Sequence, residues 1–415
     1  MKVRLRRSHI KGDLSAMSSK SDVHRALICA AFSDDECLIR TNCISDDMAA
    51  TMGCLNAVGA DISYDEAEGG FLVRPLRGPV REGLIEADCG ESGSTLRFLI
   101  PVFSAIAANV RFLGRGKLPE RPVSVILSEL RRHGAKVEGD KMPFTIAGRA
   151  SSGEYELPGD VSSQFITGLL LSFPLMEGNS LLRLSTELQS SPYVDMTMDT
   201  MSRFGVRIKR KDRSFSYEKG QASSGYKSLG IYEADGDWSN AAFFLAANAI
   251  YGAEEIRLRG LRQDSIQGDK AIASILSELE GGVDVTMDAS EVPDLVPIVA
   301  AAMALFPGEH RIVNAGRLRI KESDRLRAIS EGLTGLGASV TELPEGLIIN
   351  GRNELKGGAT VSSFNDHRIA MALSIAALFC REEVLIDGAE AVNKSFPSFF
   401  TELRRLGADL EIIEA

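Results

Sequence analysis

Apolar and polar positions recur along the chain in a pattern that predicts six similar units. In each unit a short polar cluster opens a segment that is apolar nearly all round, as expected for a helix that is buried on every side. The six segments begin near the following residues: Ser21, Gly93, Ser163, Ser239, Asp294 and Asp366. We therefore expect six buried helices.

A second pattern follows each buried segment at a nearly constant distance. A helix with one apolar stripe ends at a glycine, and an alternating, strand-like run follows at once, as in LRRHGAKVE and LTGLGASVT. A glycine in the left-handed conformation commonly ends a helix in this way. These pivot glycines come 38 to 43 residues after the starts of the buried segments, at Gly59, Gly134, Gly205, Gly282, Gly337 and Gly407. Two patterns that keep one offset six times indicate an internal repeat.

Each repeat predicts the order buried helix, strand pair, amphipathic helix, glycine, strand. A chain of 415 residues exceeds what one hydrophobic core normally supports. We therefore expect an α/β fold of two domains, each with three repeats in pseudo-threefold symmetry around buried parallel helices. The repeat count places the boundary between the domains in the polar stretch 209–228, KRKDRSFSYEKGQASSGYKS.

Composition and charge narrow the possible partners. The chain is 44% hydrophobic and 25% charged, with a net charge of −10. Because a nucleic acid or an anionic membrane would need a basic face, this charge argues against both as partners. We find no signal peptide and no apolar run of 18 residues, so we expect a cytoplasmic protein. The six cysteines and five histidines show no metal-ligand spacing, and we expect no metal.

The polar residues at the predicted helix starts are of types that bind anions. A helix N-terminus offers unpaired N–H groups and a partial positive charge. Arg25 and Arg97 sit one turn inside otherwise apolar helices, where an unpaired charge would be costly. One such cluster alone is more often an ordinary helix cap. Six in corresponding positions favour a small, multiply anionic ligand, and their residues are Lys20, Ser21, Arg25, Ser92, Gly93, Ser94, Thr95, Arg97, Ser162, Ser163, Gln164, Asp294, His367 and Arg368.

The stretch RIKESDRLRA, from Arg319 to Ala328, has two possible readings. It could be the solvated start of a helix, or it could hold a catalytic carboxylate among cations. An apolar stripe follows it and ends at Gly337, which makes it the start of an amphipathic helix. The stripe consists of Leu326, Ile329, Leu333 and Leu336.

Together these motifs resemble the family of 5-enolpyruvylshikimate-3-phosphate (EPSP) synthases over nearly the whole chain. The resemblance rests on SKSDVHRAL, GESGSTLRF, LPERPV, DVSSQF, SSPYVDMT, QGD, VPDLVP, IKESDRLRA, NDHRIAMA and NKSFPSF, in the family's order. It implies two domains of three βαββαβ repeats, with residues 14–230 in one and residues 1–13 and 231–415 in the other. It also implies an active site in the cleft between them and chain crossings near Leu14–Ser18 and Ser228–Gly236.

The reaction that the resemblance implies is an addition and elimination. Phosphoenolpyruvate would give its enolpyruvyl group to the 5-hydroxyl of shikimate 3-phosphate, with release of phosphate, in the shikimate pathway to aromatic amino acids. We expect no metal or organic cofactor, only these two anionic substrates as partners, and a monomer.

The resemblance also implies a role for individual residues. Shikimate 3-phosphate would be held by Lys20, Ser21, Arg25, Ser162, Ser163, Gln164, Ser190, Tyr193, Asp294 and Lys321. Phosphoenolpyruvate would be surrounded by Lys20, Gly93, Arg121, Gln164, Arg325, Arg368 and Lys394. Asp294 and Glu322 would be the acid/base pair, assisted by Lys20, with Arg97 and His367 in support. Two carboxylates can exchange protons with a substrate when their surroundings separate their proton affinities.

Three other functions are compatible with parts of the pattern. The UDP-N-acetylglucosamine enolpyruvyl transferases share the fold, but they normally carry a reactive cysteine in the loop that corresponds to GRGKLPERP, which has none here. An RNA 3′-phosphate cyclase would need a nucleotide signature and a less acidic surface. A non-catalytic repeat scaffold would not need arginines at buried helix starts.

Overall fold

The computed structural model describes residues 1–220 and 225–413, which form two compact units. The N-terminal unit is Ser18–Asp235, and the C-terminal unit combines Met1–Met17 with the chain from Gly236 onward. The chain therefore changes unit at Met17/Ser18 and again at Asp235/Gly236. These points lie a few residues beyond the expected domain limits at 13/14 and 230/231.

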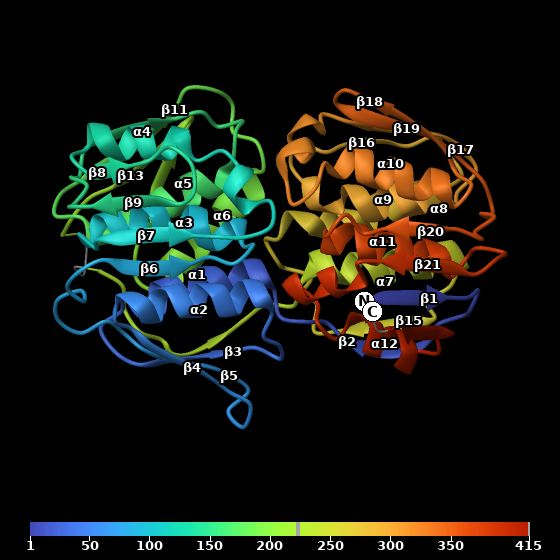
Figure 1. The fold of residues 1–415 in the computed structure, drawn as a ribbon, viewed down its shortest axis with the longest axis horizontal. Coiled ribbons are helices and arrows are strands. Elements are labelled where there is room, and N and C mark those ends of the chain that lie inside the picture. The colour runs from blue at the N-terminus through green and yellow to red at the C-terminus, as the bar shows by residue number, and fades with distance from the viewer. Residues whose placement is uncertain (221–224, 414–415) are drawn as a thin grey trace. The chain divides into compact units, whose positions relative to one another are not determined.

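The strands of the described chain are short and are distributed over both units (Figure 1). They are β1 (Lys2–Leu5), β2 (Gly12–Ser15), β3 (Cys37–Arg40), β4 (Asp61–Asp65), β5 (Gly70–Arg74), β6 (Ile85–Asp88), β7 (Val110–Leu113), β8 (Lys136–Glu138), β9 (Phe144–Ala147), β10 (Glu154–Leu157), β11 (Ser180–Leu184), β12 (Lys209–Lys211), β13 (Ser214–Tyr217), β14 (Gly230–Glu233), β15 (Ile256–Arg259), β16 (Thr286–Asp288), β17 (Gly308–Val313), β18 (Ser339–Leu343), β19 (Gly346–Gly351), β20 (Thr360–Ser362), β21 (Val384–Asp387) and β22 (Leu410–Ile413).

The helices alternate between buried and amphipathic along the chain. They are α1 (Lys20–Ala31), α2 (Asp46–Val58), α3 (Gly93–Ala105), α4 (Ser124–Arg132), α5 (Ser163–Ser172), α6 (Ser191–Arg203), α7 (Trp238–Tyr251), α8 (Ile272–Glu280), α9 (Val296–Met303), α10 (Arg325–Gly335), α11 (His367–Ala377) and α12 (Phe399–Arg405). Short 3₁₀ turns are η1 (Leu118–Glu120), η2 (Phe173–Leu175), η3 (Gly268–Ala271), η4 (Pro293–Leu295), η5 (Gly316–Ile320) and η6 (Ala389–Lys394).

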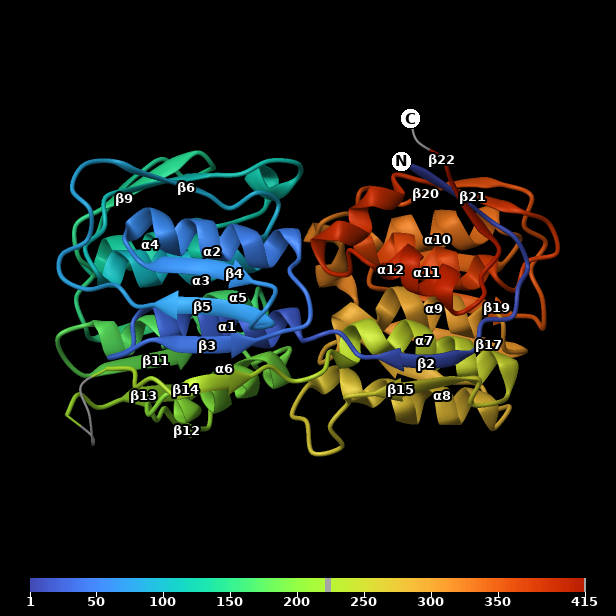
Figure 2. The same ribbon diagram turned by 90° about the horizontal axis from the view of Figure 1, so that it is seen from below.

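The predicted buried helices are present in both units. They are α1, α3 and α5 in the N-terminal unit and α7, α9 and α11 in the C-terminal unit, and every residue of α11 is buried. Figures 1 and 2 show the helices of each unit lying beside one another, with the sheets toward the outside of that unit. The fold thus gathers several helix starts within each unit.

The repeat has a different internal order from the one expected. Along the chain it is strand, helix, strand, helix, strand, strand, as in β6-α3-β7-α4-β8-β9. One strand separates the two helices. The strand pair follows the pivot glycine as an antiparallel hairpin, for example β4 with β5.

The sheets repeat one topology. In the N-terminal unit the strand orders are β14-β3-β5-β4, β6-β7-β9-β8 and β10-β11-β13-β12, each with one parallel pair and two antiparallel pairs. The C-terminal unit has β16-β17-β19-β18, β20-β21-β1-β22 and the parallel pair β15-β2.

Strands from distant parts of the chain complete three of these sheets. β14 pairs with β3, so that residue 230 lies opposite residue 37, which is far away in the sequence. In the C-terminal unit, β1 lies between β21 and β22, and β2 pairs with β15. The C-terminal unit is therefore built from two separate segments of the chain, whereas the N-terminal unit is one segment whose last strand joins its first sheet.

The domain boundary predicted from the repeat count, in residues 209–228, is wrong. Lys209–Lys211 and Ser214–Tyr217 pair as the hairpin β12-β13 inside the N-terminal unit. Residues 221–224 of that stretch lie outside the described residues. The unit continues to Asp235 because β14 is needed to complete the sheet of the first repeat.

All six pivot glycines adopt the predicted conformation. Their φ angles are +120° at Gly59, +93° at Gly134, +81° at Gly205, +71° at Gly282, +93° at Gly337 and +107° at Gly407. Another glycine, Gly168, allows close approach of α3 and α5, because a Cβ there would overlap the carbonyl oxygen of Arg97. This approach brings the polar starts of α3 and α5 within side-chain reach of each other.

Candidate active site

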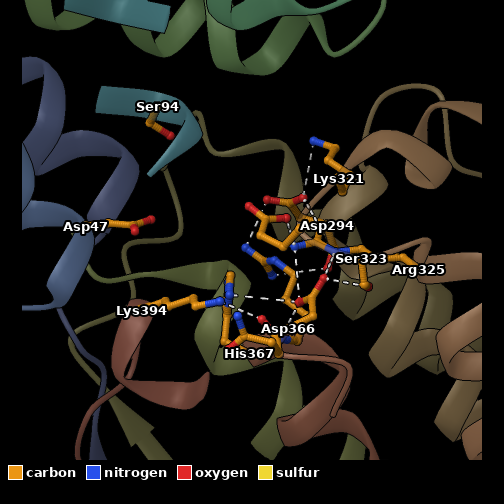
Figure 3. A network of polar contacts seen from close by, with 12 residues as sticks. Asp47, Ser94, Asp294, Lys321, Ser323, Arg325, Asp366, His367 and Lys394 are labelled. Carbon is orange, nitrogen blue, oxygen red and sulfur yellow. Dashed lines mark hydrogen bonds and ion pairs between the residues drawn. The ribbon is translucent and has the colours of Figure 1, made fainter. Parts of the chain in front are cut away.

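In the C-terminal unit, the side chain of Arg325 lies among three carboxylates (Figure 3). Arg325 is 1% exposed. Its Nε donates to Asp366 Oδ2 at 2.7 Å, its Nη1 to Asp294 Oδ1 at 2.9 Å and its Nη2 to Glu322 Oε2 at 2.7 Å. A guanidinium carries its donors in a rigid plane, so one side chain fixes the positions of all three acids.

The start of α10 explains how RIKESDRLRA folds. Arg325 is the first residue of the helix, and the side chain of Asp324 caps it by accepting from the N–H of Arg327 at 3.2 Å. Lys321 and Glu322 lie just before the helix, with side chains 25% and 19% exposed. The apolar stripe that follows is fully buried, at Leu326, Ile329, Leu333 and Leu336. Arg325 and Glu322 therefore belong to an ionic cluster, whereas Arg327, whose side chain is 65% exposed, lies on the solvated side of the helix.

Asp294 has three cationic neighbours in this cluster. It lies in η4, directly before α9, and its Oδ2 is 2.9 Å from Arg368 Nη2, while Lys321 Nζ is 3.8 Å from its Oδ1. Burial alone would raise the pKa of Asp294, but Arg368, Lys321 and Arg325 outweigh burial and lower the pKa well below its usual value. Asp294 is therefore ionised at neutral pH.

The start of α11 forms the other side of the cluster. Asp366 is the N-cap and accepts from the N–H of Arg368 at 2.9 Å, and it is 0% exposed. The preceding Phe364 and Asn365 have φ angles of +52° and +55°, which residues other than glycine rarely adopt. The carbonyl of Asn365 accepts from Lys394 Nζ at 2.5 Å. Strained backbone of this kind concentrates at functional sites.

Arg368 joins the starts of all three buried helices of this unit. Its Nη1 donates to Ser239 Oγ in α7 at 2.7 Å and to the carbonyl of Asp294 at 3.1 Å. Asp269, in η3, lies close by. Burial, helped by the charge of Asp294, raises the pKa of Asp269 to about 6, while Arg368 acts in the opposite direction. The helix starts therefore converge on a cluster with closely balanced positive and negative charges.

In the N-terminal unit, Arg25 organises the start of α1. It is 2% exposed, and it donates to Thr197 Oγ1 at 2.8 Å, to the carbonyl of Tyr193 at 2.8 Å and to the carbonyl of Ser21 at 2.5 Å. Burial lowers the pKa of Arg25 to about 10, so it stays charged at neutral pH. It ties α1 to α6 while keeping a positive charge at the helix start.

The start of α3 has the features of an anion site. Ser92 caps the helix by accepting from the N–H of Thr95 at 3.2 Å. A Cβ added to Gly93 would collide with the guanidinium of Arg121 and lie 3.0 Å from Arg97 Nη1. Backbone N–H groups at a helix N-terminus beside two guanidinium groups favour a phosphate or carboxylate ligand.

Gln164 links the starts of α3 and α5. It accepts from Arg97 Nη1 at 2.8 Å and donates to Ser94 Oγ at 3.1 Å. The α5 helix begins at Ser163, and Ser162 is its N-cap, whose hydroxyl accepts from the N–H of Gln164 at 3.4 Å. The three neighbouring positions 162–164 are thus held at one polar surface.

Lys20, Ser190 and Tyr193 complete the set predicted for this unit. Lys20 opens α1, and its Nζ is 2.7 Å from Asp47 Oδ2 in α2. Ser190 stands directly before α6 with a left-handed φ of +58°, and Tyr193 lies in the first turn of that helix. These residues, like the others, lie at helix starts.

The chain matches the family model of EPSP synthase (3-phosphoshikimate 1-carboxyvinyltransferase) over residues 6–403. The chain belongs to the EPSP synthase family. Its activity is the one that names the family, the transfer of a carboxyvinyl group to 3-phosphoshikimate, and it is a transferase of the shikimate pathway to aromatic amino acids. The comparisons give no better support to the UDP-N-acetylglucosamine enolpyruvyl transferase alternative.

Individual EPSP synthases agree with the family match. The 3-phosphoshikimate 1-carboxyvinyltransferase of Clostridium acetobutylicum is 44% identical over 418 residues, covering 97% of this chain and 96% of that protein. The Clostridium perfringens protein of the same name is 39% identical over 429 residues and covers 99% of both. The structure of EPSP synthase from Acinetobacter baumannii superposes with a TM-score of 0.81 over 99% of this chain and 100% of that one, at 23% identity. This likeness confirms the predicted two-domain α/β fold class.

The structure places every predicted site residue at or beside a helix start of its own unit. In the C-terminal unit it gathers Asp294, Lys321, Glu322, Arg325, His367, Arg368 and Lys394. Of these, His367 is 2% exposed, and its Nδ1 is 3.9 Å from Asp366 Oδ1. The catalytic and binding roles of these residues remain predictions.

Three acids of the site were missed by sequence reasoning. Asp366 fixes Arg325, Asp47 contacts Lys20, and Asp269 stands beside Arg368 and Asp294. Cations and helix-capping residues indicate an anion site, so these acids were not among the predicted residues. The NDHR motif nevertheless contains Asp366 directly before the buried helix. A rule that each buried cation needs a carboxylate partner would have pointed to it.

Among residues 1–220 and 225–413, no group of three or more His, Cys, Asp and Glu side chains is placed to hold a metal ion. Within the same residues, no helix has both the length and the apolar character needed to cross a membrane.

Proposed function

We propose that Asp294 and Glu322 are the acid/base pair that moves the enolpyruvyl group from phosphoenolpyruvate to the 5-hydroxyl of shikimate 3-phosphate. The addition step needs a proton at the methylene carbon of phosphoenolpyruvate, while the 5-hydroxyl loses one. Elimination then removes a proton from the resulting methyl group and releases phosphate. Two carboxylates in different surroundings can carry out both transfers.

The observation that carries this proposal is the arrangement around Arg325. The arginine holds the side chains of Asp294 and Glu322, which are 21% and 19% exposed, while its third partner, Asp366, is 0% exposed. Two acids are thus presented at a surface, and the third serves as a buried counter-charge.

The difference between the two acids supports an assignment of roles. Asp294 has a lowered pKa and is ionised, as a base for the 5-hydroxyl must be. Glu322 Oε2 lies 2.7 Å from Arg325 Nη2, whereas the carboxylate of Asp294 lies 2.9 Å from both Arg325 and Arg368. We assign Glu322 the transfer of the proton to and from the carbon. Lys20, whose ammonium group balances the charge of the anionic substrates, is the third catalytic residue.

The substrates would bind to the helix starts of both units. Shikimate 3-phosphate takes Lys20, Ser21, Arg25, Ser162, Ser163, Gln164, Ser190 and Tyr193 of the N-terminal unit, with Asp294 and Lys321. Phosphoenolpyruvate takes Lys20, Gly93, Arg121, Gln164, Arg325, Arg368 and Lys394. The guanidinium groups beside Gly93 and the ammonium groups at α1 and α11 support these assignments.

We further propose that the enzyme works as a monomer in the cytoplasm, without a nucleic acid or membrane partner. The net charge of −10 supports the absence of polyanionic partners. Sedimentation velocity of the purified protein with both substrates tests the monomer directly, and a stable dimer would refute it.

Phosphate release from the purified protein with both substrates, and without added metal, tests the residue roles. Glu322→Gln and Asp294→Asn should each lose most of kcat while the protein stays folded. Glu331→Gln, on the exposed side of α10, is the matched control and should keep full activity. Near-normal kcat in either site variant would remove that residue from the acid/base pair. Turnover of UDP-N-acetylglucosamine in place of shikimate 3-phosphate would overturn the proposed substrate.

A further inference from the structure

The carboxylate of Asp22 is a buried acid that was not among the predicted site residues. Asp22 is the third residue of α1, between Ser21 and Arg25, and it is 6% exposed. Its Oδ1 accepts from the hydroxyl of Tyr232 at 2.5 Å, and its Oδ2 accepts from the N–H of Asp235 at 3.0 Å. The side chain therefore points from the start of α1 to the residues at and after the end of β14.

The segment that Asp22 holds is the last stretch of the N-terminal unit. The carbonyl of Asp235 accepts from the N–H of Ser19 at 2.7 Å, directly before α1. The peptide groups of Asp235 are thus held on both sides, the N–H by Asp22 and the carbonyl by Ser19. The first turn of α1 and the end of the unit form one hydrogen-bonded piece.

Helix capping does not account for this acid. The N-cap, Ser19, makes no side-chain capping bond, and the carboxylate of Asp22 accepts from Tyr232, Asp235 and Thr200, all far from it in the sequence. Burial raises the pKa of Asp22, and the bonds from Tyr232 and Asp235 oppose that rise. Arg203 lies 3.9 Å over the ring of Tyr232 and holds the tyrosine in place. The buried carboxylate, whose burial costs free energy, is thus surrounded by groups that fix its position.

We propose that Asp22 is a positioning residue for the anion-binding end of α1. By holding Tyr232 and Asp235 it fixes the orientation of the helix turn that carries Lys20 and Ser21. The inference rests on the proposed role of these two residues in binding shikimate 3-phosphate. Asp22 itself does not touch the substrate, so its loss should weaken binding and leave the chemical step nearly unchanged.

The expected effect follows from the loss of one hydrogen bond to a charged group. Asp22→Asn and Tyr232→Phe should each raise the Kd for shikimate 3-phosphate about tenfold, with a parallel rise in KM and little change in kcat. Because Asp22 and Tyr232 share one hydrogen bond, the double variant should raise Kd by less than the two single changes combined.

Tyr155→Phe is the matched control. Tyr155 is a second buried tyrosine of the same unit, and its hydroxyl donates to the carbonyl of Ser151 at 2.6 Å, away from the start of α1. It should lower the melting temperature as the test variants do, but keep the Kd of the unmodified protein. Calorimetric titration with shikimate 3-phosphate measures Kd, and the phosphate-release assay gives KM and kcat.

The outcomes separate this inference from the function on which it rests. If the unmodified protein does not bind shikimate 3-phosphate, the proposed function fails. If it binds, and both test variants bind equally well despite lowered melting temperatures, Asp22 has only a structural role and the inference is overturned. Tyr232→Phe, which removes one hydroxyl, keeps the test decisive if Asp22→Asn does not fold.

Discussion

The replacement of Arg325 by lysine tests the ionic cluster most directly. The guanidinium contacts Asp366, Asp294 and Glu322 at 2.7 to 2.9 Å from three different nitrogen atoms. A lysine keeps the positive charge but has a single nitrogen on a flexible chain, so it cannot reach all three carboxylates at once. At least one acid would lose its contact with the side chain at position 325, and Asp366, one of the three, is 0% exposed.

The size of the effect follows from these contacts. Removing one partner of a buried ion pair costs about 3–5 kcal/mol. With a urea dependence of about 2 kcal/mol per M, this loss lowers the unfolding midpoint by about 1.5–2.5 M. A domain stable by about 5–15 kcal/mol stays folded in water under that loss, so the variant can be purified and measured.

The chain contains its own probe for this measurement. Its one tryptophan, Trp238, opens α7 in the C-terminal unit and is 4% exposed, so its fluorescence reports the unfolding of that unit. Arg327→Lys is the matched control. That side chain lies on the same helix, is 65% exposed and pairs only at the surface with Glu331, and the change should cost less than about 0.5 kcal/mol. Equal midpoints for the two variants would refute the account of Arg325 as the centre of the cluster.

Two further predictions concern charges at the helix starts. Lys20→Met should raise the Kd for shikimate 3-phosphate at least tenfold by calorimetry, because a cation beside Asp47 is lost, and unchanged binding would contradict its placement. Asp269 has a folded-state pKa raised to about 6, so the folded protein binds a proton more tightly than the unfolded chain and loses stability as the pH rises from about 4 to about 6. Asp269→Asn removes that titration, and its melting temperature relative to the unmodified protein should therefore rise between about pH 4.5 and 7.5. A difference that does not change with pH would show that Asp269 has an ordinary pKa.

Much of the fold could be predicted because short sequence patterns indicate the repeat. Each pivot glycine is needed for a positive φ, and each buried helix must be apolar on all sides. The same local signals located Arg325 at the start of α10. The order of strands within the repeat was not predicted correctly, because short strands such as Cys37–Arg40 carry too few residues to show a period.

The parts that could not be predicted depend on contacts between distant segments. Asp294, Glu322 and Asp366 meet at one guanidinium only because three helix starts converge. A buried arginine indicates that some carboxylate must pair with it, but the sequence does not show that Asp366 is the one. The pairing of β14 with β3 could not be predicted from the sequence either, because Gly230–Glu233 shows no alternation of apolar and polar residues that specifies a partner strand.

The position of β1 has a consequence for the order in which the protein forms during synthesis. The ribosome makes β1 before the N-terminal unit, but it makes the neighbours of β1, β21 and β22, after that unit. The N-terminal unit has all its strands once Asp235 has been made, whereas the last sheet of the C-terminal unit must wait for almost the whole chain. Closing so long a loop is slow, and both edges of β1 stay unpaired in the meantime. The N-terminal unit can therefore fold before β1 meets its partners. The C-terminal unit depends more on protection from aggregation during this time.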